Sequence, residues 1–203
     1  MHHNATLSLL LGLTLAFTAG CSKDDQELPA PTPEAVPEPS ITYSRAIVYQ
    51  DNGQRRDTTF QAAQLVASAT QSTHSLSVGV APATTAEGIR FTLDRTKLPA
   101  TFSGTYTLQT LRDRTLDAET RFYYDLPERL GGGTVIYPSG MQHVTGNFVI
   151  SGYDAKRQLL SGTYTTTLTG ANDPTVAYST FPKRKCDITV SGTFANIPVR
   201  AGQ

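Results

Sequence analysis

The sequence predicts an all-β domain, an antiparallel meander of about eight to ten strands that forms either a barrel-like (lipocalin-like) sheet or a two-sheet sandwich. Apolar and polar residues alternate with a period of two through much of the chain after residue 41. Threonine, which suits half-buried strands better than helix interiors, is frequent. A pattern of hydroxyl residue, glycine, polar residue and aromatic residue also recurs along the chain.

Length, charge and cysteine content exclude several classes of protein. The 203 residues are enough for one domain with appendages. The 17 basic and 17 acidic side chains balance, so the clustered basic excess of a nucleic-acid binder is missing and no nucleic-acid partner is expected. Only 2 cysteines are present, which excludes a disulfide-stapled scaffold and a cysteine-rich zinc module.

Residues 1–20 are expected to be a lipoprotein signal peptide. The uncharged, leucine-rich stretch from Ala5 to Gly20 is too short for a membrane span of about 20 residues and ends in small side chains. The segment Thr18-Ala19-Gly20-Cys21 resembles the lipobox of bacterial lipoproteins, which implies that Cys21 is lipidated and becomes the mature N-terminus. The alternative is an ordinary signal peptide followed by a chance cysteine.

Residues 21–40 are expected to be an acylated cysteine followed by a flexible Pro/Glu-rich tether. Five of the 12 prolines lie between Pro29 and Pro39, and such a segment favours extended geometry and forms no core. Its start resembles the export tag of Bacteroidota surface lipoproteins, with the residues Ser22, Lys23, Asp24 and Asp25. That resemblance implies a lipid-anchored outer-membrane protein exposed on the cell surface; the alternative is a plain polar spacer.

Residues 41–203 are expected to form a single all-β domain. Residues 41–49 alternate and lead into Asn52-Gly53, a dipeptide typical of a tight hairpin turn. Residues 76–80 and 89–93 alternate in the same way. The stretch from Phe60 to Ala69 is compatible with a short helix through its alanine and glutamine, but its valine and serine favour the strand that we predict.

The recurring four-residue pattern predicts how strands pack. We expect its glycine and aromatic residue to face the interior together and its hydroxyl residues to face outward, so that each glycine leaves room for a neighbouring ring. Residues 144–152 and 159–168 are further predicted to pair as one hairpin around a turn at 153–158. The pattern occurs at Ser103–Tyr106, Thr145–Phe148, Ser161–Tyr164 and Ser191–Phe194.

The run from Val144 to Val199, with its Gly-Asn-Phe, Ser-Gly-Thr-Tyr and closing Ser-Gly-Thr-Phe-Ala-Asn-Ile-Pro segments, resembles an uncharacterised all-β domain family of Bacteroidota lipoproteins. The resemblance covers about a third of the chain. Its motifs are structural glycines and aromatics, so it implies a family of unknown function and carries over no active site.

The arrangement of cysteine and histidine residues in the sequence predicts no catalytic, cofactor-binding or metal site. Cys186 precedes an alternating run, so we expect a small buried or edge position at the start of a strand rather than a nucleophile. His74 and His143 lie on separate expected strands without metal-ligand spacing. No cofactor is expected, and we do not expect an enzyme.

Three other clusters have structural interpretations. Gly131–Gly133 lacks the lysine and hydroxyl residue of a phosphate loop and is expected to be a flexible loop. The basic trio Lys183–Lys185 follows Pro182 and is expected on a solvated loop, with an anionic partner as the alternative. Five carboxylates between Asp113 and Glu128 match no calcium-loop spacing, and four arginines between Arg112 and Arg129 neutralise their charge, which favours a salt-bridged loop over a calcium site.

These observations favour a surface lipoprotein that binds a small ligand or a glycan. Tyr123 and Tyr124 stand near the glycine loop, and we expect them to face the ligand at the mouth of a curled sheet. The absence of tryptophan weakens a sugar-stacking platform. The alternative is a structural or protein-interaction accessory of the cell envelope, and an enzyme is the third interpretation. Expected partners are the membrane, through the N-terminal lipid anchor, and a small ligand, a glycan or an envelope protein.

Overall fold

The computed structural model describes residues 35–84, 87–177 and 179–202. The expected signal peptide, the lipidation site Cys21 and the export residues Ser22–Asp25 lie outside these residues. The described residues from Val36 onward form one compact unit. No helix in the described part is long and apolar enough to cross a membrane.

The described part of the chain contains twelve strands joined by turns and four 3-10 helices. The strands are β1 Ser40–Ile41, β2 Ser44–Tyr49, β3 Arg55–Thr59, β4 Leu65–Gln71, β5 Ser75–Pro82, β6 Glu87–Asp94, β7 Gly104–Thr107, β8 Ala118–Asp125, β9 Thr134–Pro138, β10 His143–Asp154, β11 Leu159–Asn172 and β12 Lys185–Ala201. The 3-10 helices are η1 Ala62–Gln64, η2 Arg95–Lys97, η3 Glu128–Leu130 and η4 Ser139–Met141. The all-β prediction is confirmed, with more strands than the eight to ten expected.

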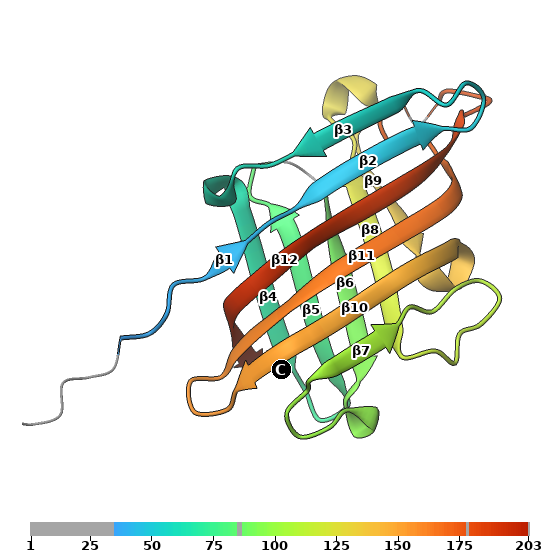
Figure 1. Cartoon of the computed structure of the whole chain (residues 1–203). Coiled ribbons are helices and arrows are strands. Elements are labelled where there is room, and N and C mark those ends of the chain that lie inside the picture. Colours follow the sequence, from blue (N-terminus) through green and yellow to red (C-terminus); the bar gives the residue numbers. More distant parts are fainter. Residues whose placement is uncertain (1–34, 85–86, 178, 203) are drawn as a thin grey trace, which may run out of the picture. The chain divides into compact units, whose positions relative to one another are not determined.

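All twelve strands belong to one open sheet that turns over into two layers (Figure 1). The first layer has the order β3-β2-β12-β11-β10-β7 and the second the order β4-β5-β6-β8-β9. The 17-residue strand β12 joins them. It pairs with β2 near its start, and at its end Val199–Ala201 pair in parallel with β4. The other strand pairings are antiparallel, and the two-residue β1 pairs with β12 alone. The longer strands β3, β7 and β9 remain as edges, so the architecture is closer to a sandwich than to a closed barrel.

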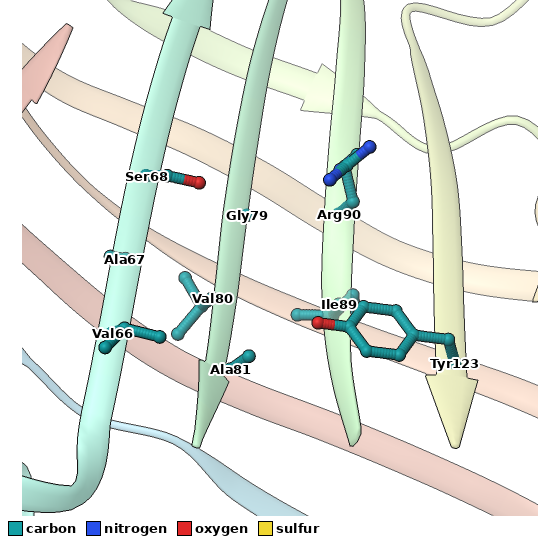
Figure 2. A pocket seen from close by; sticks show the side chains of 9 residues that line it. All are labelled: Val66, Ala67, Ser68, Gly79, Val80, Ala81, Ile89, Arg90 and Tyr123. Carbon is teal, nitrogen blue, oxygen red and sulfur yellow. The ribbon is translucent and has the colours of Figure 1, made fainter. Parts of the chain in front are cut away.

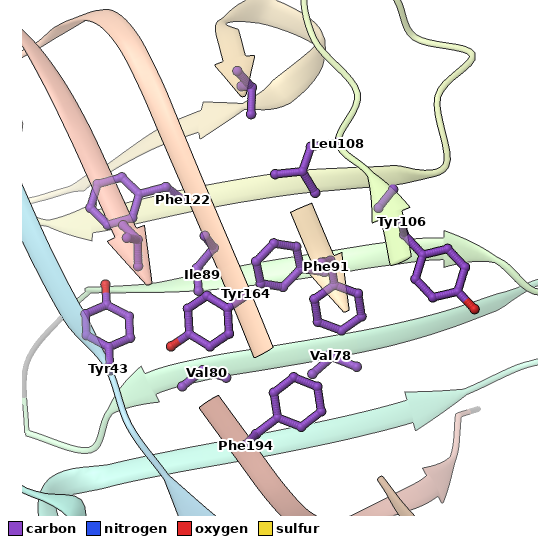
Figure 3. Packing of buried hydrophobic residues seen from close by; sticks show 14 of the residues in the cluster. Tyr43, Val78, Val80, Ile89, Phe91, Tyr106, Leu108, Phe122, Tyr164 and Phe194 are labelled. Carbon is purple, nitrogen blue, oxygen red and sulfur yellow. The ribbon is translucent and has the colours of Figure 1, made fainter. Parts of the chain in front are cut away.

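Aromatic side chains fill the space between the two layers. Phe91 of β6 stacks on Phe148 of β10 with ring centroids 4.5 Å apart, and Phe148 stacks on Phe194 of β12 at 5.7 Å. Figure 3 shows Phe91 and Phe194 gathered with Val78 and Val80 of β5. The aromatic residues of all four repeats, Tyr106, Phe148, Tyr164 and Phe194, are buried in this core. The predicted inward face is therefore confirmed.

Two of the four repeat glycines, Gly162 and Gly192, make room for rings on the paired strand. The prediction that every repeat glycine does so is wrong, since a Cβ on Gly146 would meet only backbone atoms of β11. Gly192 of β12 lies opposite Tyr164 of β11, and a Cβ built on Gly192 would lie 2.8 Å from Cζ of that tyrosine. On the outward face the hydroxyl residues pair with one another, as in the 3.0 Å hydrogen bond between Thr167 and Thr189. Small residues inside and hydroxyl residues outside thus follow from one alternating pattern.

Both predicted hairpin turns are confirmed, whereas the strand predicted from Phe60 to Ala69 is only partly correct. The hairpin of β10 and β11 is confirmed, since His143 pairs with Thr169 and Asp154 with Leu159. The Asn52-Gly53 turn is also confirmed and joins β2 to β3. The strand predicted from Phe60 to Ala69 begins only at Leu65. Ala62–Gln64 form a 3-10 turn without a buried residue, because that stretch carries no apolar side chain large enough to hold a strand on the core.

Candidate functional site

Strand β8 places the two tyrosines expected at the ligand on opposite faces of the second layer. Tyr124 points inward, where it packs against the core and lies under the Arg45 guanidinium at 5.5 Å from ring centroid to Cζ. Tyr123 points outward and lines a hollow on the layer's outer face. They do not share one mouth, because successive residues of a strand face opposite sides. Whether either tyrosine contacts a ligand stays a prediction.

The glycine loop does not belong to this hollow. Gly131, Gly132 and Gly133 all have positive φ angles, of 99°, 65° and 89°, which only glycine adopts without strain. The loop is closed by a 2.9 Å hydrogen bond from the Leu126 N–H to the Gly133 carbonyl. It forms a turn between β8 and β9 and is absent from the hollow's lining. These glycines therefore shape a turn and not a ligand mouth.

The hollow has a volume of about 160 Å³ and lies across β4, β5, β6 and β8 (Figure 2). Small side chains on neighbouring strands keep its floor low, with Gly79 of β5 beside Ser68 of β4. Tyr123, Arg90 and Val66 supply the large side chains around it. The complete lining is Val66, Ala67, Ser68, Gly79, Val80, Ala81, Ile89, Arg90 and Tyr123.

A glycine fixes the position of the Tyr123 ring. Gly88 of β6 lies opposite Tyr123 in the sheet, and a Cβ built there would lie 2.6 Å from the tyrosine Cζ and 2.8 Å from Cβ of Ala81. The ring therefore lies over the backbone of β6 and reaches towards β5. A ring held against a strand in this way can present an aromatic face to the hollow.

Apolar residues continue the row on both sides of Tyr123. Val66 pairs with Ala81, and Tyr123 pairs with Ile136 of β9. Val66 is 51% exposed and Ile136 is 54% exposed. The outer face of the second layer thus carries an apolar row that crosses the sheet, with Tyr123 as its aromatic member.

Arg90 gives the hollow a positive charge. It stands on the outer face, opposite Arg121 of β8, and makes no ion pair with a described residue, whereas Arg121 pairs with Glu119 at 2.9 Å. Burial raises the pKa of the Tyr123 phenol above its ordinary value, and nearby Arg90 opposes that rise. At neutral pH the hollow therefore offers a neutral phenol, a guanidinium and the hydroxyl of Ser68.

This combination suits binding rather than bond making. No histidine, cysteine, aspartate or glutamate lines the hollow, so Ser68 has no general base beside it there. Within the described ranges no group of three or more such side chains could hold a metal ion. The geometry offers stacking, hydrogen bonding and attraction of a negative charge.

Cys186 lies where the sequence predicts, at the start of β12 and fully buried. Its thiol contacts the Ala171 carbonyl with Sγ 3.7 Å from the oxygen. Burial raises the pKa of this thiol to about 12. The thiolate is therefore suppressed at neutral pH and the residue packs as a small apolar side chain.

A buried ion pair connects the two layers and was missed by sequence reasoning. Arg45 of β2 contacts Glu87 of β6, and the two side chains are 10% and 3% exposed. Arg45 also donates a 3.0 Å hydrogen bond to Thr58. The Tyr43 hydroxyl, Arg45 Nε and Glu87 Oε1 have no hydrogen-bond partner among the residues that the structure describes. The sequence does contain a sign of this pair. Arg45 alternates in step with the inward-facing residues Tyr43, Ile47 and Tyr49, and a charged side chain on the inward face of a strand indicates a buried partner of opposite charge.

The two charged loops are engaged within the fold. Arg184 of the basic trio pairs with Asp51 at 2.6 Å and lies over the Tyr49 ring at 3.8 Å, and Lys185 already belongs to β12. In the carboxylate-rich stretch, Asp113 accepts hydrogen bonds from the N–H and hydroxyl of Thr115. These contacts hold turns and strand ends in place.

Comparisons with protein-family models, with curated proteins and with solved structures gave no match in any of the three. The geometry of the site itself therefore carries the functional interpretation.

Proposed function

We propose that this protein is a lipid-anchored surface lipoprotein whose β domain binds a glycan at the hollow beside Tyr123. One observation carries the proposal: a tyrosine ring held over Gly88 lies next to Arg90, which has no ion-pair partner among the described residues, above a floor of small side chains. Sugars present a C–H face that packs on aromatic rings and hydroxyl groups that accept from guanidinium N–H groups.

Arg90 also favours one kind of sugar. A guanidinium binds a carboxylate through charge-assisted and often bidentate hydrogen bonds, about twice as strong as neutral ones. A saccharide with a uronic acid therefore uses both Tyr123 and Arg90. The hollow is shallow and buries little ligand surface, so we expect weak binding, with a Kd on the order of 1 mM for a short oligosaccharide.

The anchoring part of the proposal rests on the N-terminal sequence. The leucine-rich segment that ends in small residues before Cys21 supports acylation at that cysteine. The acidic run Asp24-Asp25 behind it supports export to the outer face of the outer membrane. Proline-rich residues 29–39 would hold the domain away from the membrane surface.

Titration of the protein with uronic-acid and neutral oligosaccharides tests the binding proposal. We expect Tyr123→Ala and Arg90→Ala each to weaken binding of the acidic oligosaccharide about tenfold, and Tyr123→Phe to retain most of it because the ring remains. Arg121→Ala is the matched control, since this arginine stands opposite Arg90 in the sheet but does not line the hollow. Equal affinities for wild type, Tyr123→Ala and Arg90→Ala would contradict the proposal and favour a structural or protein-interaction accessory.

A further inference from the structure

The three edge strands longer than two residues differ in how they are protected. Unpaired strand edges invite pairing with another chain, and proteins usually blunt them with charges, short length or a cover. Edge β3 carries Arg55, Arg56 and Asp57 within five residues, and edge β7 is only four residues long. Edge β9 has the uncharged sequence Thr-Val-Ile-Tyr-Pro and pairs only with β8 among the described strands.

A hollow of about 490 Å³ runs along this uncharged edge. Val135, Ile136 and Tyr137 all line it. Consecutive strand residues point to opposite faces, so a hollow that touches three in a row follows the edge of the strand and not one face of the sheet. The Tyr137 hydroxyl donates a 2.6 Å hydrogen bond to the Asn172 carbonyl at the end of β11, which holds the opposite wall in place.

The opposite wall is apolar and basic. It consists of Phe181, Pro182, Lys183 and Lys185, and no carboxylate lines the hollow, whose remaining residues are Gln142 and Asn172. We call this hollow, together with the free edge of β9, the β9 groove.

Exposed apolar side chains gather around the β9 groove. Phe181 is 85% exposed and Ile136 is 54% exposed, and both line it. Met141, 68% exposed, directly precedes the lining residue Gln142. Leu111, 45% exposed, donates its N–H to the Gln142 carbonyl at 2.8 Å. Such a concentration on one part of a surface is typical of an interaction site.

We propose that the β9 groove binds an extended acidic peptide segment of a partner protein by strand addition. The free backbone groups of β9 would pair with the peptide backbone, which gives affinity, while alternate side chains enter the groove. Lys185 lies in a lining that contains no carboxylate, and its charge would select acidic residues among the apolar ones. The groove adjoins the apolar row at Ile136, which pairs with Tyr123, but it shares no lining residue with the hollow at Tyr123. The proposal does not depend on the glycan-binding proposal.

Two other occupants fit the groove less well. A second copy of the chain, paired edge to edge through β9, would bring Lys183 and Lys185 of both copies together, and like charges at an interface are unfavourable. A lipid surface would accept Phe181 and the lysines, but its acyl region offers no hydrogen bonds to the free backbone groups of the strand.

Selection from a display library of random linear nonapeptides against the full-length chain in detergent tests the proposal. We expect enriched peptides to alternate apolar and acidic residues. An enriched peptide is then resynthesised with N-methyl groups on its odd-numbered or on its even-numbered amides. Strand addition uses the N–H groups of one phase only, so one methylated series should lose binding at least tenfold while the other retains it.

Charge variants of the protein provide the second readout. Lys185→Glu should weaken the selected peptide at least tenfold, whereas Lys97→Glu, the same charge change at an exposed lysine outside the groove, should leave binding unchanged. The proposal is overturned if both methylated series bind like the parent peptide, or if Lys185→Glu binds as wild type does. Failure to enrich any peptide overturns the proposal as well. In that case, retention of the chain on phosphatidylglycerol vesicles through Phe181 would indicate a lipid surface as the occupant, and self-association of the chain would indicate a second copy.

Discussion

The Phe194 ring of β12 lies over Gly162, its partner in the register of β11. A Cβ built on Gly162 would lie 2.6 Å from Cζ of Phe194 and would overlap the Val149 carbonyl oxygen on β10. Glycine at this position therefore serves two neighbours, because it accepts a ring from one strand and close approach of the backbone of another.

Gly162→Ala should consequently destabilise the domain by about 1–3 kcal/mol, as overpacking in a filled core does. Gly152→Ala on β10 is the matched control, because a Cβ there meets nothing within 4 Å. Urea denaturation of the two variants checks this prediction. If both variants unfold at the wild-type midpoint, the space at Gly162 is not required.

A feature of this core could be predicted from the sequence when the residues that determine it are close together in the chain. The inward phase of Tyr164 and Phe194 follows from alternation within one strand, and the pairing of β10 with β11 follows from a short turn. The parallel pairing of Val199 with Ala69 joins distant residues, and no local pattern encodes such a contact. The candidate site contains one local and one non-local feature. Alternation along β8 is enough to predict that Tyr123 and Tyr124 face opposite sides of the sheet. The contact of Tyr123 with Gly88 depends on the register between β6 and β8, which the local sequence does not determine.

Because Arg45 and Glu87 form a buried ion pair, we expect the losses of stability caused by substituting each residue not to add up. Glu87→Ala should cost about 3–5 kcal/mol, because it leaves the Arg45 charge buried without its partner. The double variant Arg45→Met with Glu87→Leu should cost less than Glu87→Ala alone, since it removes both charges and their unsatisfied atoms. Equilibrium unfolding of Arg45→Met, Glu87→Leu and the double variant measures the coupling between the two side chains. A double variant as unstable as the sum of the two single variants would show that the pair does not act as a unit.

Cys186 predicts a loss of stability in alkaline solution. Its thiol has an ordinary pKa of 9.0, which burial raises to about 12 in the folded chain. The unfolded state therefore releases the proton first, so this thiol contributes stability below about pH 9 that is lost as the pH rises towards 12. Between pH 8 and 10, Cys186→Ala should show a flatter fall in its urea midpoint than wild type does. Parallel falls in the two proteins would exclude the thiol as the cause.

Cys21 predicts membrane attachment through acylation. Cys21→Ser should move the protein from the membrane fraction to the soluble extract, because the lipid is the proposed anchor. Cys186→Ala serves as the control for loss of a cysteine, and it should partition as wild type does. Fractionation followed by immunoblotting makes the measurement. Equal membrane retention of wild type and Cys21→Ser would refute the proposed anchor.

Chemical-shift mapping tests the proposed glycan site most directly. Backbone amide spectra of the non-acylated Cys21→Ser chain would be recorded during titration with a uronic-acid oligosaccharide, with Tyr123→Ala in the same background as the comparison. We predict that the shifted amides concentrate on the outer face of the second layer, at Ser68, Gly79, Arg90 and Tyr123. Tyr123→Ala should move the titration midpoint to an oligosaccharide concentration about tenfold higher. Shifts confined to the β9 groove or to the hydroxyl-covered face of the first layer, or no shifts at any concentration, would contradict the proposal.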